Sequence, residues 1–242
     1  MIRKAERGAP YIRRSWRYLE LQFRGDVTQT RMLRWYPHWL LVGYTRTMLA
    51  GLLLQPRPAR IGIIGLGGGA QARFCHRFLP HSTIEVVEND PGVLALRRPL
   101  HVPADDARFS VELGDGAEWI KQRRGRYDLL LVDGYDIHGI PPVLASQRFH
   151  DDCAAALTPG GVMASNWFAA DVNKMTAKMR GAFAERTQVL SEPGMENRVA
   201  FGWGREAMPQ APQQVLSELS WLARRQLRDG LQRFAASLSA PV

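Results

Sequence analysis

Short apolar runs alternate with amphipathic segments through the middle of the chain. The apolar runs predict strands, at Ile61–Gly65, Ile84–Glu88, Phe109–Leu113, Leu129–Asp133 and Val162–Asn166. The amphipathic segments predict helices, at Gln71–Phe78, Pro91–Leu100, Ala117–Arg123, Ser146–Leu157 and Ala170–Glu185. Alternating strands and helices are typical of a parallel sheet whose right-handed crossovers place helices on both faces. The pattern therefore predicts an α/β fold.

Period-two alternation precedes this region. It covers Trp16–Phe23 and Val27–Leu33, with Arg24-Gly25-Asp26 between them as the turn, so these segments predict a β-hairpin. A helix is expected next, from about Pro37 to Leu54, and a proline-containing stretch ends it. The hairpin and this helix form a small extension in front of the sheet.

The pattern changes again towards the C-terminus. Thr187–Leu190 and Val199–Trp203 predict a closing antiparallel strand pair, with a turn at Glu192–Asn197. Leucines near helical spacing predict a helix over Gln213–Leu238 that packs against the domain or a second subunit. The whole predicts a doubly wound, mostly parallel seven-stranded Rossmann-like sheet with a small N-terminal β-hairpin/helix extension. We expect an N-terminal hairpin and helix, a nucleoside-binding catalytic domain and a C-terminal helix, at residues 1–55, 56–206 and 207–242.

A glycine-rich turn joins the first predicted strand to its helix. Gly65, Gly67, Gly68 and Gly69 lie in this turn, where the absence of a Cβ lets the backbone turn tightly and approach a ligand. Buried strand-to-helix turns also use glycine for packing, so the turn alone is weak evidence. Glu88 ends the next strand, about twenty residues further on, and an acidic side chain there can accept both hydroxyls of a ribose. We therefore expect a nucleoside-containing ligand.

Acidic residues also follow the third and fourth predicted strands. Asp115, beside Gly116, could accept a hydrogen bond from an adenine amino group, and a helix N-cap is the alternative. Asp133, Tyr135 and Asp136 follow the fourth strand. Ligands of open parallel sheets bind beyond the carboxyl ends of the strands. The position of all these acids at one edge favours a common site over separate capping roles.

Composition limits the possible functions. The 242 residues carry a net charge of +9, with arginines gathered at both ends, yet no recognised nucleic-acid module accompanies them, so nucleic acid is not an expected partner. No apolar stretch has the length of a membrane span, and no signal-peptide-like segment follows the first basic residues, so we expect no membrane association. Cys75 and Cys153 lie outside any metal-ligand spacing and are expected to be reduced, which favours a cytoplasmic protein without a metal.

The same motifs resemble the spermidine synthase family, the polyamine aminopropyltransferases, which have the class I methyltransferase-type fold. The similarity spans roughly Arg31 to Gly161. It rests on the segments Gly65–Gly69, Val87–Pro91, Gly114–Gly116, Tyr127–Asp136 and Leu157–Gly161. The first three of these are shared with class I methyltransferases generally. Asp133 and Asp136, followed by a Gly-Ile-Pro-Pro turn, are the more specific mark.

The resemblance implies alkyl transfer from an S-adenosyl sulfonium donor, either decarboxylated S-adenosylmethionine or S-adenosylmethionine, to a small-molecule amine. An alkylammonium has no free lone pair at neutral pH, so it must lose a proton before it attacks. Asp133 resembles the general base and Asp136 resembles a partner that holds the cation. Tyr135 could form a hydrogen bond with the incoming amine nitrogen, or it could pack under its loop. His138 could shuttle protons, or it could face solvent. We expect the protein to be a homodimer.

Departures from the family leave alternatives open. Ala70 stands where the family's glycine loop normally ends with Asp, and Arg46 lies on the helix where a Tyr-His-Glu-like signature is expected. Gln71 or Arg73 could instead contact a donor carboxylate, although Arg73 could equally lie on a helix surface. The first alternative is therefore a methyltransferase that uses intact S-adenosylmethionine, and the second is a non-catalytic nucleoside-binding relative. Core packing or a substrate-lining role would fit the aromatic residues before the sheet, Trp35, Tyr36, Trp39 and Tyr44.

Overall fold

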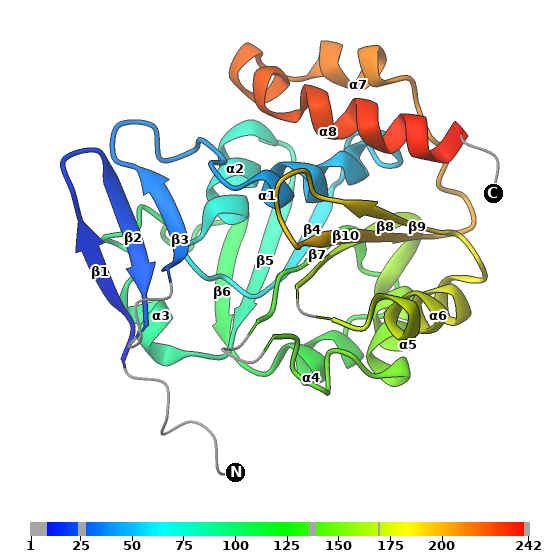
Figure 1. Ribbon diagram of the computed structural model, residues 1–242, viewed down its shortest axis with the longest axis horizontal. Coiled ribbons are helices and arrows are strands. Elements are labelled where there is room, and N and C mark those ends of the chain that lie inside the picture. The colour runs from blue at the N-terminus through cyan, green and yellow to red at the C-terminus, as the bar shows by residue number, and fades with distance from the viewer. Residues whose placement is uncertain (1–8, 24–27, 136–138, 169, 240–242) are drawn as a thin grey trace.

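Seven strands form the central sheet in the part of the chain that this computed structural model describes, residues 9–23, 28–135, 139–168 and 170–239. They are β4 (Arg60–Ile64), β5 (Thr83–Glu88), β6 (Phe109–Leu113), β7 (Tyr127–Val132), β8 (Leu157–Trp167), β9 (Thr187–Ser191) and β10 (Arg198–Trp203). Their order is β6-β5-β4-β7-β8-β10-β9, and β10 runs antiparallel to both of its neighbours (Figure 1). The predicted mostly parallel, seven-stranded sheet is confirmed.

Helices cover both faces of this sheet (Figure 1). One face carries α4 (Gly116–Lys121), α5 (Gln147–Ala156) and α6 (Val172–Phe183). The other face carries α1 (Gly43–Met48), the 3-10 helix η1 (Leu49–Leu53), α2 (Ala70–Phe78) and α8 (Trp221–Ser239). Successive strand residues point to opposite faces, so Ile63 packs with the second group of helices and Ile64 with the first. Such strands are apolar on both faces, which is why they read as continuous apolar runs.

A separate antiparallel sheet precedes the main one. β2 (Tyr18–Gln22) and β3 (Thr28–Leu33) form the predicted hairpin, whose turn residues lie outside the described part of the chain. A third strand, β1 (Tyr11–Arg14), pairs with β2 and is not among the predicted elements. Leu21 of β2 packs into the main core, and Thr30 of β3 contacts the glycine turn. The small sheet therefore lies beside the glycine turn.

The helix predicted from Pro37 to Leu54 is wrong in its first half, because α1 begins at Gly43. The backbone N–H of Leu40 donates to Oε1 of Gln226 at 2.7 Å, so a tertiary contact takes the group that a helix would have used. After Met48 the chain tightens into η1. Sequence periodicity does not reveal such a long-range competitor.

Two further helices differ from their predictions. The helix expected at Pro91–Leu100 is the short α3 (Pro91–Ala95), followed by tight turns in which the N–H of Arg97 donates to the Leu94 carbonyl at 3.2 Å. The C-terminal segment is divided into α7 (Pro212–Glu218) and α8. Ser220 lies between them, and its hydroxyl accepts a hydrogen bond from the Ala223 N–H at 3.4 Å, which starts the second helix.

Candidate functional site

The strands β4 and β7 lie side by side where the strand order reverses. The chain leaves β4 towards β5 and β6 on one side, and β7 then pairs with β4 on the other side. Ile64 pairs with Val132, so Gly65 and Asp133 are neighbours where the strands end, and the Asp133 N–H donates to the Ile64 carbonyl at 2.9 Å. Ligands of open α/β sheets bind at such a switch point. The topology thus brings the glycine turn and the acid after the fourth predicted strand together.

A cavity opens at this point. Its walls come from β3, α1, the glycine turn and the start of α2, and include Thr30, Tyr44, Gly67, Gln71 and Asp133. Gly65 has a φ of +91°, and a Cβ there would overlap the carbonyl oxygen of Asp133. A Cβ on Gly68 would overlap the Thr30 side chain, whose hydroxyl accepts from the Gly68 N–H at 3.2 Å. Gly65, Gly67 and Gly68 line the cavity, and Gly69 is the N-cap of α2.

Glu88 ends β5 and is buried against the glycine turn. Its Oε2 accepts from the N–H groups of Leu66 at 2.9 Å and Gly67 at 3.2 Å, and its Oε1 accepts from Asp90 at 2.9 Å. The carboxylate therefore fixes the shape of the turn. Oε2 already accepts two hydrogen bonds, whereas Oε1 accepts one and keeps a further lone pair, so these bonds are compatible with a role in holding one ribose hydroxyl.

Neighbouring side chains hold the Asp133 carboxylate by hydrogen bonds at the end of β7. Its Oδ1 accepts from Nδ2 of Asn166 at 2.9 Å, and the hydroxyl of Tyr44 donates to its carboxylate. Asn166 is held in turn, because its Oδ1 accepts from Nδ2 of Asn197 at 2.9 Å. Burial raises the pKa of Asp133, against the opposing hydrogen bonds from Asn166 and Tyr44. This carboxylate is consequently more basic than an exposed aspartate.

The loop that follows Asp133 is described in part. The Tyr135 hydroxyl donates to the backbone carbonyl of Asn166, and its ring contacts Phe168 edge-on with centroids 6.5 Å apart. Burial raises the pKa of Tyr135, with the nearby Asp133 acting in the same direction. Asp136 and His138 lie outside the described residues. The roles given to Asp136 and Tyr135 in catalysis stay predictions.

Asp115 and Gly116 start α4 beyond the end of β6. Oδ1 of Asp115 accepts from the N–H groups of Ala117 at 2.8 Å and Glu118 at 3.1 Å, so the side chain is the N-cap of that helix. The capping alternative is therefore present in the structure. A contact from Asp115 to an adenine stays a prediction, which its exposed position permits.

Arg73 lies neither on the surface of its helix nor in the cavity. The side chain is fully buried, and its guanidinium donates to three backbone carbonyls, those of Pro37 at 2.7 Å, Leu100 at 2.7 Å and Gly68. Burial lowers the pKa of Arg73 to about 9, so the group is still charged at neutral pH. Arg73 holds the back of the glycine turn and is not placed to contact a donor carboxylate. Gln71, in contrast, lines the cavity.

The aromatic residues before the sheet separate into different environments. Tyr44 lines the cavity beside Asp133, whereas Trp35 and Tyr36 are exposed and Trp39 lies against Arg225. A single role for all four, in the core or at the substrate, is therefore wrong. Arg46, which would repel a cationic substrate in the cavity, is not among the residues that line it.

Three residues of the site are not among those predicted from the sequence. Asn166 and Asn197 support Asp133, and Asn166 could have been found, because it is a polar residue at the carboxyl end of a buried strand. Thr30 carries no such signal, since its contact with Gly68 depends on how the small sheet packs. Within the described ranges, no helix is long and apolar enough to cross a membrane, and no cluster of His, Cys, Asp and Glu is suited to a metal ion.

Comparisons with solved structures give the same fold. A spermidine synthase solved with the transition-state analogue AdoDATO superposes with a TM-score of 0.68 at 19% identity, covering 96% of this chain and 85% of that chain. Human methyltransferase-like protein 13, solved with SAH, gives 0.63 at 25% identity, covering 79% and 93%. Together with the switch-point cavity, these matches define a Rossmann-like protein of the class I methyltransferase type.

Sequence comparisons narrow the class. The model of the spermine/spermidine synthase domain matches residues 43–189. A polyamine aminopropyltransferase of Chromobacterium violaceum is 34% identical over 213 residues, which are 88% of this chain and 79% of that protein. Another, from Neisseria meningitidis, is 36% identical over 153 residues, which are 62% of this chain and 58% of that protein. The chain belongs to the spermine/spermidine synthase family, and it is a transferase.

Proposed function

We propose that the protein transfers an aminopropyl group from decarboxylated S-adenosylmethionine to a small-molecule amine. The observation that carries this proposal is the position of Asp133, a carboxylate with a raised pKa in the same cavity as the glycine turn. Similarity to polyamine aminopropyltransferases supports the choice of reaction. In this proposal Glu88 holds the donor's ribose, Asp115 its adenine, and Asp136 a cationic group of the acceptor.

The reaction needs a base more than it needs an acid. The amine nitrogen attacks the propyl carbon bonded to the sulfonium sulfur, the C–S bond breaks, and its electron pair returns to sulfur to give neutral methylthioadenosine. The proton lost from the attacking ammonium passes to Asp133. Asn166 and Tyr44 hold the Asp133 carboxylate at the cavity wall, so they position the base before the amine arrives.

A methyltransferase reaction on intact S-adenosylmethionine is the second candidate. Ala70 favours it, because this residue lines the cavity at the end of the glycine turn and supplies no carboxylate for an aminopropyl ammonium. A match to the eEF1A lysine and N-terminal methyltransferase of Xenopus laevis also favours it, at 30% identity over 165 residues, which are 61% of this chain and 24% of that protein. The two reactions differ in the donor carbon that is attacked, and their products can be separated.

The test measures donor binding and product together. Titration calorimetry would compare intact donor, decarboxylated donor and methylthioadenosine, and chromatography would follow products with a series of α,ω-diamines. We expect methylthioadenosine as the product, and loss of about a hundredfold or more in turnover for Asp133→Asn with donor binding retained. Glu118→Gln, at an exposed position on α4, is the matched control and should behave as wild type. Release of S-adenosylhomocysteine instead, or full turnover of Asp133→Asn, would contradict the proposal.

Ala70→Asp separates the two donors further. The new carboxylate would stand at the cavity wall near the N-terminus of α2, where it could pair with the donor's ammonium. We expect poor selectivity for the decarboxylated donor in the wild type and a shift of binding towards it in the variant. A wild-type preference of about a hundredfold, roughly 2.7 kcal/mol, would contradict this expectation. We also propose a cytoplasmic homodimer, which sedimentation and fractionation would check.

A further inference from the structure

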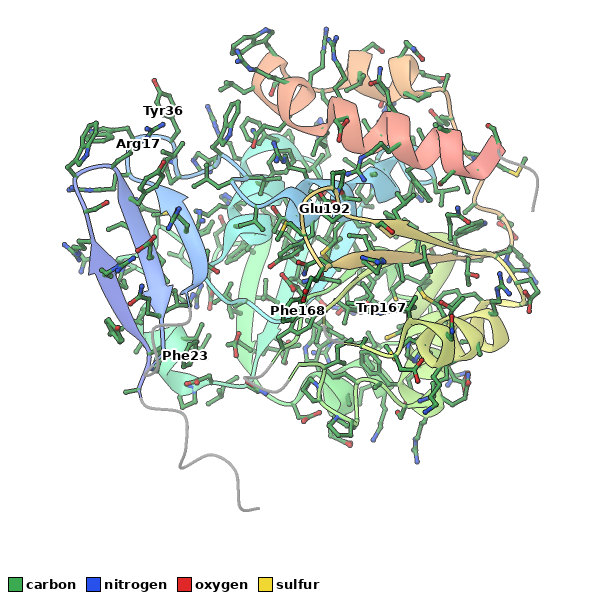
Figure 2. The ribbon with its side chains drawn as sticks, in the orientation of Figure 1. Arg17, Phe23, Tyr36, Trp167, Phe168 and Glu192 are labelled. Carbon is green, nitrogen blue, oxygen red and sulfur yellow. The ribbon has the colours of Figure 1, made fainter. Side chains whose placement is uncertain are left out.

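Aromatic and arginine side chains gather at one end of the N-terminal sheet. We call Trp16, Arg17, Arg34, Trp35 and Tyr36 the Trp/Arg tip. The rings of Trp16 and Trp35 lie 5.7 Å apart, and the Arg34 guanidinium lies 5.8 Å from the ring centre of Trp35. Trp16, Trp35 and Tyr36 are 75%, 60% and 65% exposed. Figure 2 labels Arg17 and Tyr36 at this outer end of the molecule.

In the described part of the chain, exposed arginines lie beside these rings. The segment that ends at the tip, residues 28–39, contains two arginines and no aspartate or glutamate. On the adjoining strand Glu20 is already paired with Arg13 and Arg31, each at 2.6 Å. Within the described ranges, Arg17 and Arg34 form no ion pair with a carboxylate; Arg34 donates instead to the Ser15 carbonyl at 3.0 Å. The tip is thus a cationic surface with exposed aromatic faces.

The charge decides between possible occupants. In a two-fold contact with a second copy, the same patch faces itself, so arginines would meet arginines. An acidic protein segment would satisfy the guanidinium groups but would leave the indole faces exposed. A single-stranded nucleic acid satisfies both, because bases stack on aromatic rings while phosphates pair with arginines. Charge alone did not favour such a partner in the sequence, and the exposed rings are the additional observation.

We propose that the Trp/Arg tip binds single-stranded nucleic acid. Bases stack on Trp16, Trp35 and Tyr36, and phosphates contact Arg17 and the exposed Arg14 at the end of β1. Because stacking tolerates any base, binding has little sequence preference. This site is separate from the transferase cavity, and the proposal does not depend on the proposed reaction.

The experiment is fluorescence anisotropy with a labelled oligothymidylate. The double variant Trp16→Ala/Trp35→Ala should lose at least tenfold in affinity, and Arg17→Ala should lose severalfold. With two or three phosphate contacts, raising salt from about 50 to 200 mM should weaken wild-type binding roughly tenfold. Trp221→Ala, which removes a 65% exposed tryptophan of α8, and Arg148→Ala, on α5, are matched controls that should bind as wild type. Transferase activity and melting temperature should stay unchanged in all of them.

Three outcomes would overturn the proposal. One is an oligothymidylate affinity that does not change in the tryptophan double variant. Another is tighter binding of a polyglutamate peptide of equal charge, which would make the partner an acidic protein segment. The last is a dimer in light scattering that becomes a monomer on Trp16→Ala/Trp35→Ala, which would make the tip a subunit contact.

Discussion

The Asp133 carboxylate is held by two donors at the cavity wall, yet burial still raises its pKa. A base must be ionised, so activity should fall as pH drops through this raised pKa, above the ordinary aspartate value of about 3.9. The measurement is kcat/KM against pH with a saturating donor. The residual activity of Asp133→Asn should lack this limb, and an identical limb in the variant would assign the titration to another group.

The raised pKa of Asp133 also affects the stability of the fold. Because the pKa of Asp133 is higher in the folded than in the unfolded protein, protonation of this side chain favours folding. The resulting stabilisation is fully present below the pKa of the unfolded state, and it is lost as the pH rises through the pKa of the folded state. At neutral pH the wild type therefore carries the cost of a buried charge that Asp133→Asn avoids. We expect a higher melting temperature for the variant at neutral pH, and a smaller difference as the pH is lowered. A melting temperature below that of the wild type at neutral pH would show that the carboxylate stabilises the fold.

Glu88 joins the glycine turn to the proposed ribose site. Its replacement by Ala should weaken methylthioadenosine binding at least tenfold, about 1.4 kcal/mol, because a charged acceptor is lost. Calorimetry with free adenine is the control, since a ligand without a ribose should lose much less. Equal losses for both ligands would mean that Glu88 acts through the shape of the turn, which its bonds to Leu66 and Gly67 would explain. Unchanged binding would remove Glu88 from the site.

At the scale of elements, α2 depends on a buried arginine. Arg73→Met would leave the carbonyls of Pro37, Gly68 and Leu100 without their donor, and a buried unsatisfied polar group costs about 1–3 kcal/mol. We expect the free energy of unfolding, measured by urea titration, to fall by about 3 kcal/mol, because partial relaxation of the structure around the carbonyls reduces the full loss. Arg77→Met replaces an exposed arginine of the same helix and should change stability by less than about 0.5 kcal/mol. Similar effects for the two variants would contradict a structural role for Arg73.

The elements also show what a single sequence can predict. The apolar runs predict the limits of the sheet strands to within two residues, because apolar residues on both faces give a strong and local signal; the exception is β8, which begins at Leu157, five residues before its predicted start. The start of α1 at Gly43 was missed, because Gln226 competes for the Leu40 N–H from a distant part of the chain. Asp133 can be identified from the predicted end of β7. The hydrogen bond by which Asn197 holds Asn166, the partner of Asp133, depends on the pairing of β8 with β10. Local patterns thus predict strands and their ends, whereas contacts between distant segments set helix limits and the second layer of the site.

At the scale of the whole molecule, one apolar cluster joins all three predicted parts. It includes Leu21 of the N-terminal sheet, Leu52 of η1, Ile63 of β4 and Leu231 of α8. The division at residues 1–55, 56–206 and 207–242 stays a prediction about the chain, and the shared core leads us to expect that the parts do not unfold separately. Tryptophan fluorescence and far-ultraviolet circular dichroism should then report a single coincident transition.

A pair of leucines on α8 tests this cooperativity. Leu231 is 0% exposed in the shared core, and Leu231→Ala should cost about 3 kcal/mol, which corresponds to roughly 6–12 °C for a chain of this size. Leu222, on the same helix but 39% exposed, should cost less than about 1 kcal/mol when changed to Ala, because little apolar area is uncovered. The fluorescence and circular dichroism transitions should shift together in Leu231→Ala, because α8 packs against η1 and cannot detach without exposing the shared core. A variant in which α8 melts first, while the sheet keeps its wild-type transition, would show that the C-terminal helix is an independent unit.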